Sequence, residues 1–91
     1  MTSSTPYRST PVFDQDTLPQ ALRARHDTKE GVWGMIRVIE GRVKLTYIDP
    51  PSEVVLAPGI PGLVLPRQPH FVTPLGSMKM QVDFYEARPD G

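Results

Sequence analysis

The chain of 91 residues contains no cysteine. Without thiols, no disulfide can brace this small domain and no thiolate ligand is available to a metal. No apolar run approaches the roughly 20 residues that span a bilayer. The N-terminal segment MTSSTPYRST lacks the basic and apolar regions of a secretory signal. Together these absences predict a cytoplasmic protein with no membrane contact.

An excess of positive charge is also missing. Ten Lys and Arg residues balance ten Asp and Glu residues, for a formal net charge of zero. Proteins that bind nucleic acids concentrate basic residues on one face, because phosphate contacts dominate their affinity. The pairs Arg23/Arg25 and Arg42/Lys44 are short alternations typical of solvated strand faces. The charge pattern therefore predicts no nucleic-acid partner.

Two common catalytic arrangements are absent from the sequence. The serines are confined to the N-terminal segment, Ser52 and Ser77, and no histidine lies at motif spacing from them. This pattern argues against a serine hydrolase triad. No glycine-rich loop joins a strand to a helix, so a nucleotide phosphate loop is not indicated either.

What the sequence does contain is a series of short apolar segments, separated by 11 prolines and 7 glycines. Alternation with period two predicts strands in most of them. The predicted strands cover residues 33–39, 42–48, 53–57, 62–65, 70–73 and 78–85. Glu40 and Gly41 are expected at the tip of an antiparallel hairpin, with a positive φ at Gly41. Many short strands predict an all-β sandwich or barrel in a single domain over residues 1–91, with 1–10 loose.

Residues 22–26 allow two interpretations. Leu22, Ala24 and His26 alternate with arginines, which favours a half-buried strand. Gln, Ala, Leu and Arg are also good helix formers, so a helix over 17–25 is the alternative. On the strand interpretation His26 shares an inward face with Leu22 and Ala24.

The chain has only two histidines, and the pattern predicts that they meet. His70 lies in LPRQPHFVTPLG, where Pro66 and Pro69 restrict the backbone just ahead of it. It shares its strand face with Val72, so its side chain is expected to lean inward. With His26 also inward, we expect the two imidazoles to come together in the mouth of the barrel.

The order of strand, EG turn, strand, PG turn and P-x-x-x-H resembles a small cupin, a jelly-roll β-barrel. More specifically, the PVF…LPQ opening, RHDTK-x-G, IEG, the P…HFV segment and the closing DFY resemble the N-terminal domain of tellurite-resistance protein B and its YeaR-like relatives. The match covers roughly residues 7–87. It implies a metal- or ligand-binding domain linked to tellurite, oxyanion or nitrosative stress. In longer members a methyltransferase domain follows, and its activity is not implied for this chain.

The resemblance also implies a metal site. A typical metal cupin takes two histidines and a glutamate from its first motif and a histidine from its second. His70 matches the second-motif histidine, whereas the usual glutamate position falls on Gly34, which cannot ligate. His26 and Glu30 lie near the remaining positions. The predicted set is therefore His26, His70 and Glu30, holding one divalent ion of zinc, iron, nickel or manganese.

Further side chains are candidates for contact with a small-molecule ligand: Trp33, Gln81 and Asp83. Each has a simpler structural role as an alternative. Trp33 can pack at the barrel rim, and Glu30 can be a solvated loop charge. Asp83 needs a partner if it is buried, because an unpaired buried carboxylate is unstable. His70 can simply hydrogen-bond a loop carbonyl, and His26 can be an exposed residue at the end of a strand.

Three functional hypotheses follow. The first is a metal-binding module, and the second is a metal-dependent enzyme of the dioxygenase or isomerase type. The third is a metal-free module that binds a small molecule through the two histidines. A homodimer is also expected, because a small barrel exposes strand edges that the stretch around Val12 and Phe13 could cover in a second copy.

Overall fold

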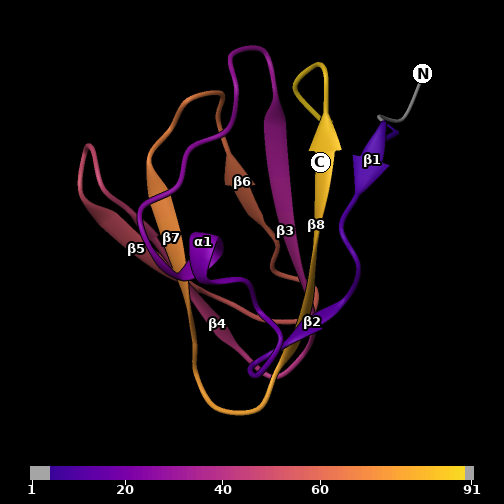
Figure 1. The fold of residues 1–91 in the computed structure, drawn as a ribbon, viewed down its shortest axis with the longest axis vertical. Coiled ribbons are helices and arrows are strands. Elements are labelled where there is room, and N and C mark those ends of the chain that lie inside the picture. The colour runs from indigo at the N-terminus through magenta and orange to yellow at the C-terminus, as the bar shows by residue number, and fades with distance from the viewer. Residues whose placement is uncertain (1–4, 90–91) are drawn as a thin grey trace.

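The computed structural model describes residues 5–89 as two antiparallel β-sheets packed face to face (Figure 1). Sheet A has the strand order β1-β8-β3-β6, with β2 also paired to β8, and sheet B has the order β5-β4-β7. The elements are β1 (Arg8–Ser9), β2 (Phe13–Asp14), α1 (Gln20–Arg23), β3 (Trp33–Glu40), β4 (Val43–Tyr47), β5 (Ser52–Leu56), β6 (Gly62–Val64), β7 (His70–Pro74) and β8 (Lys79–Tyr85). The predicted all-β, cupin-like fold is confirmed. No helix in the described part of the chain is long and apolar enough to cross a membrane.

The core lies between the two sheets. Side chains alternate between the faces of each strand, and the inward set is apolar. From β8, Met80 and Val82 are buried together with the preceding Met78, and Phe84 packs against them. The other buried core residues are Leu18, Ile36, Val38, Val43, Leu45, Leu56, Val64 and Val72.

The turn at Glu40 and Gly41 joins strands of different sheets. β3 pairs with β6 and β8, whereas β4 pairs with β5 and β7. The predicted hairpin is therefore wrong, although Gly41 has the expected positive φ, 73°. A hairpin and a corner between two packed sheets carry the same inward and outward alternation. The pattern alone could not separate them.

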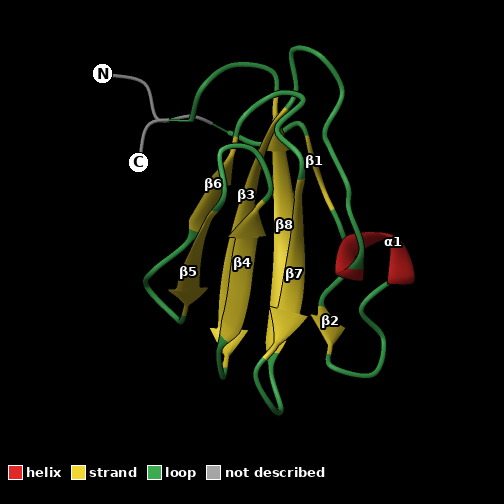
Figure 2. Cartoon of the chain, turned by 90° about the vertical axis from the view of Figure 1, so that its left-hand side faces the viewer, coloured by secondary structure: helices red, strands yellow, loops and turns green. Residues whose placement is uncertain are grey.

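Residues 22–26 do not form the expected strand. Gln20–Arg23 form α1, a single helical turn after Pro19 that lies beside β7 (Figure 2). The helical alternative is thus the better one, over a shorter range than 17–25. At Ala24 the backbone is extended, with φ −118° and ψ 177°. This return to an extended conformation brings His26 alongside β7.

The N-terminal segment takes part in sheet A. Arg8 and Ser9 pair with Phe84 and Asp83, so these two residues are ordered, contrary to the expected loose segment. Residues 1–4 lie outside the described part. Phe13 pairs with Met80 of the same chain. One edge of β2 is therefore paired within the chain. The homodimer itself stays a prediction.

Candidate functional site

The two histidines face each other across an isolated antiparallel bridge. The His26 amide donates to the His70 carbonyl, and the His70 amide donates back to His26, each at 2.8 Å. Residues paired in this way carry their side chains on the same face of a sheet. The ring centroids lie 5.6 Å apart with an edge-to-face angle of 75°. The expected meeting of the two imidazoles is confirmed.

Thr28 ties together the two loops that carry the histidines. Its hydroxyl donates to the Leu65 carbonyl and accepts from the Arg67 amide, both at 3.1 Å. The Arg67 amide also reaches the Thr28 carbonyl, at 3.1 Å. Arg67 has a φ of 60°, a region that residues with a side chain seldom adopt. These bonds hold the turn just ahead of His70 in place, so its backbone is pre-organised for the site.

The environment of His70 defines its protonation. His70 is 5% exposed, and its Nδ1 lies 2.8 Å from the Gln68 carbonyl oxygen. A carbonyl can only accept, so Nδ1 carries the proton and Nε2 of the neutral ring is the acceptor. Burial lowers the pKa of His70 and is the largest effect; the hydrogen bond with the Gln68 carbonyl opposes it, and the smaller effects of His26 and Asp27 lower and raise the pKa respectively. His70 is thus a neutral ring with one unprotonated nitrogen.

This protonation state makes stability depend on pH. The pKa of His70 is lower in the folded protein than the 6.5 of a free imidazole, so the unfolded chain binds its proton more readily. The contribution is complete above about pH 6.5 and is lost as the pH falls towards the folded pKa. We expect H70Q to reduce the change in unfolding free energy between pH 7 and pH 5, measured by urea denaturation, with S52T at the exposed start of β5 as the control. An unchanged slope in H70Q would contradict this assignment.

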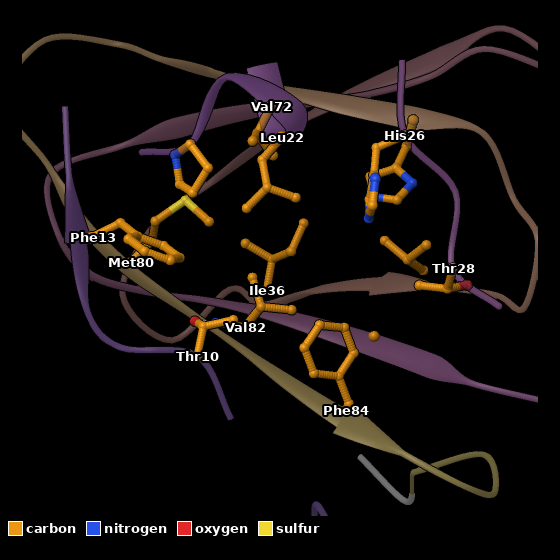
Figure 3. A pocket seen from close by; sticks show the side chains of 14 residues that line it. Thr10, Phe13, Leu22, His26, Thr28, Ile36, Val72, Met80, Val82 and Phe84 are labelled. Atoms are coloured by element: carbon orange, nitrogen blue, oxygen red, sulfur yellow. The ribbon is translucent and has the colours of Figure 1, made fainter. Parts of the chain in front are cut away.

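A partly open cavity of about 140 Å³ lies between the two sheets, with the histidines in its wall (Figure 3). Its polar side chains are His26, His70, Thr10 and Thr28. The rest of the lining is apolar, and comprises Phe13, Pro19, Leu22, Gly34, Ile36, Val64, Val72, Met80, Val82 and Phe84. The wall therefore has one end with two imidazoles and a body of apolar side chains.

The predicted metal ligands do not assemble into a set of three. Among residues 5–89, no three His, Cys, Asp or Glu side chains lie close enough to hold a metal ion together. Glu30 is exposed, next to Gly31 in a turn, and lines neither the cavity nor its rim. Two imidazoles are fewer than the three or four side chains of typical zinc and iron sites. Metal binding by His26, His70 and Glu30 is therefore not supported.

The predicted ligand contacts lie on the outer face of sheet A. Gly34 and Val82 point into the cavity. Trp33 is next to Gly34 in β3, and Gln81 and Asp83 flank Val82 in β8, so the side chains of these three residues point to the opposite face. Trp33 packs under the Arg88 guanidinium, whose carbon is 5.7 Å from the ring centroid. None of the three candidates lines the cavity.

Asp83 and Gln81 instead contact protein groups. The buried Asp83 carboxylate accepts from Arg37 Nε at 2.5 Å, from Arg37 Nη2 at 3.3 Å and from the Ser9 hydroxyl at 2.7 Å. Gln81 Oε1 accepts from Arg37 at 2.6 Å, and its amide donates to the Thr10 carbonyl at 2.8 Å. These contacts join β1, β3 and β8 across the sheet. The partner that burial of Asp83 requires is Arg37.

Sequence reasoning missed two residues of the site: Thr28 and Phe84. Thr28 lies within the DTK stretch of the family motif, and that stretch was the one signal available for it. Phe84 packs against the core and also forms part of the cavity wall. Leu22 was expected to point inward from a strand, and it reaches the cavity from α1 instead.

Comparisons with known proteins agree on one relationship. The sequence model of the TehB-like domain family matches residues 8–82 of this chain. A curated relative, "Probable S-adenosyl-L-methionine-dependent methyltransferase TehB" from Haemophilus influenzae (strain 10810), is 37% identical over 49 residues, which are 54% of this chain and 17% of that protein. This chain therefore matches less than a fifth of the relative's length.

Two solved structures share the fold. The crystal structure of TehB from Haemophilus influenzae has a TM-score of 0.81 and 28% identity, over 91% of this chain and 31% of that chain. The crystal structure of a protein from E. coli (strain K12) has a TM-score of 0.83 and 22% identity, over 97% of this chain and 94% of that one. The E. coli protein thus has nearly the same extent, and at this identity the likeness concerns the fold.

Proposed function

The chain belongs to the TehB-like domain family, and on that premise we propose that it is a metal-free module that binds a small, largely apolar molecule. The bound molecule would place one polar group against the two histidines. The methyltransferase named in the longer relative is a property of that protein, and we carry no methyl transfer over. As part of the proposal, the module acts in the cytoplasm in an oxyanion or nitrosative stress response.

The observation that supports this proposal is the cavity. Its volume of about 140 Å³ is close to the roughly 150 Å³ of an engineered apolar cavity that binds benzene. Most of the lining is apolar, and burial of an apolar group against it is favourable. The cavity thus suits a group about as large as one aromatic ring.

The histidines supply the polar part of the recognition. Because His70 Nδ1 is engaged by the Gln68 carbonyl, Nε2 is left to accept a hydrogen bond. His70 thus presents one acceptor nitrogen at the histidine end of the cavity wall. The second imidazole, His26, is half-buried and lies edge-to-face against the first. Specificity at this end therefore depends on hydrogen bonding rather than on metal coordination.

Gly34 offers a direct test of the cavity. A Cβ at this position would meet Val64 Cβ at 3.6 Å and Thr28 Cγ2 at 3.8 Å, which are ordinary contacts. The variant G34A should therefore fold at least as well as the parent, because glycine weakens a strand. Its methyl group would nevertheless occupy space that a ligand needs. We expect G34A to weaken benzene binding about fivefold or more, since overpacking costs about 1–3 kcal/mol.

Binding is measured from methyl chemical-shift changes of Ile36, Val72 and Met80 as benzene is titrated into the protein. S52T adds a methyl group at the exposed start of β5 and serves as the matched control, with unchanged binding. If benzene shifts no cavity methyl in the parent protein, or binds G34A as well as the parent, the proposal is wrong.

A further inference from the structure

A second hollow, which we call the recess, opens at the surface beside the cavity. It has a volume of about 230 Å³, and it shares His26, Thr28 and Phe84 with the cavity. Figure 3 shows these three side chains together at one end of the cavity, away from Phe13 and Met80. The other residues of the recess are Tyr7, Arg8, Asp27, Lys29 and Val32. The cavity and the recess are therefore adjacent at the histidine end, and these three side chains form part of both walls.

The recess carries more positive than negative charge. Arg8 and Lys29 line it against a single carboxylate, that of Asp27. Within residues 5–89 neither cation forms an ion pair: the pairs in this range are Arg37 with Asp83, Lys44 with Glu53 and Lys79 with Glu40. The positive charge of Arg8 and Lys29 is thus available to a ligand, in a chain whose net charge is zero.

Arg8 is held where a ligand leaving the cavity would meet it. β1 places Arg8 opposite Phe84, and the guanidinium carbon lies 6.0 Å from the Phe84 ring centroid. This distance is within the range of a cation–π contact. Phe84 also lines the cavity, so its ring contacts the apolar space and lies beside the Arg8 guanidinium.

From this arrangement we infer that the ligand is an amphiphilic anion: an apolar body about the size of one aromatic ring, carrying one carboxylate. The body occupies the cavity, and the carboxylate reaches the recess between Arg8 and Lys29. The inference rests on the proposed function and adds the charge of the ligand to it. A guanidinium binds a carboxylate through two parallel hydrogen bonds, which gives Arg8 the larger part of the recognition.

The test compares benzoate with benzyl alcohol, which has the same ring and no charge. Both are titrated into the parent protein, R8Q, K29Q and the double variant, and the cavity methyl shifts report binding. We expect benzoate to bind the parent roughly three- to tenfold more tightly than benzyl alcohol, and the double variant to lose that preference. R42Q is the control, because Arg42 lies beyond the end of β3 that is far from the recess. The 8 residues of β3 span about 26 Å at roughly 3.3 Å per residue.

The outcomes separate the two proposals. Loss of the benzoate preference in the double variant, with benzyl alcohol unchanged and R42Q like the parent, supports the inference. A benzoate preference that weakens with added salt supports it as well, since the recess is open to solvent. Equal binding of the two probes overturns the inference and leaves the apolar cavity as a binding site. If neither probe nor benzene shifts a cavity methyl, the proposed function fails and the inference fails with it.

Discussion

The variant G41A is expected to lose about 3–5 kcal/mol of folding free energy, the largest effect of a single methyl group in this chain. Two causes add. Gly41 has a φ of 73°, which a residue with a Cβ adopts only with strain. An added Cβ would also collide with the Ser77 carbonyl oxygen and lie 3.0 Å from Met78 Cα. Both obstacles are backbone atoms, so neither can move aside without disturbing the start of β8.

Gly59 provides the matched control for this prediction. Its φ is 85°, yet a Cβ there would meet nothing within 4 Å. G59A therefore measures backbone strain alone, about 1–2 kcal/mol, and the difference between the two variants measures the collision. Urea denaturation of both gives these values. A domain of this size is stable by about 5–14 kcal/mol, so G41A can be measured if it is not unfolded outright. Equal losses in the two variants would contradict the collision.

The turn at Gly41 also shows how far the sequence could predict the fold. The conformation of Gly41 follows from local chemistry, because a tight two-residue turn needs a positive φ. Which strands pair is decided by contacts far along the chain, such as Val43 with Leu56 and Pro74. Local alternation carries no information about those partners. The element type and the special glycine were therefore predictable, and the strand pairing was not.

The candidate site divides in the same way. The inward position of His70 could be predicted from its alternation with Val72 and from the prolines before it. His26 was placed inward on a strand that does not form, and it reaches His70 through the extended backbone after α1. The sequence pattern could not show whether a metal site forms, because a third ligand side chain must lie close to both histidines. Glu30 is near in sequence, but its turn leaves it exposed. The roles of Thr28 and Arg8 depend on which loops and strands lie side by side, which sequence spacing does not show.

Asp83 combines both lessons, and D83N is expected to lose about 2 kcal/mol of stability. The carboxylate is 5% exposed and accepts hydrogen bonds from Arg37 and Ser9. Asparagine has the same shape, but it has no charge, and its amide NH2 group would face the donor groups of Arg37 or Ser9. A fully buried ion pair loses about 3–5 kcal/mol when one partner is removed. The Arg37 side chain is 46% exposed, so water replaces part of the interaction, and a smaller value follows.

The same contacts give this stability a pH dependence. Burial alone raises the pKa of Asp83, but the hydrogen bonds from Arg37 and Ser9 and the charge of Arg37 outweigh it, and the pKa lies below its ordinary 3.8. The stabilisation is complete above about pH 4 and is lost as the pH falls through the lowered pKa. The stability difference between the parent and D83N should therefore shrink in acid. E53Q, whose glutamate is 62% exposed and 3.9 Å from Lys44, is the control and should change little.

Asp83 also bears on ligand binding, through β1. Ser9 is its hydrogen-bond partner and the neighbour of Arg8, and β1 has only these two residues. Losing the Ser9 contact should let β1 separate from β8 more often, and Arg8 would then spend less time at the recess. We expect D83N to weaken benzoate binding about threefold while benzyl alcohol binds as before, measured at neutral pH where the variant is folded. If D83N weakens both probes equally, Asp83 acts on the cavity as a whole and its link to Arg8 is wrong.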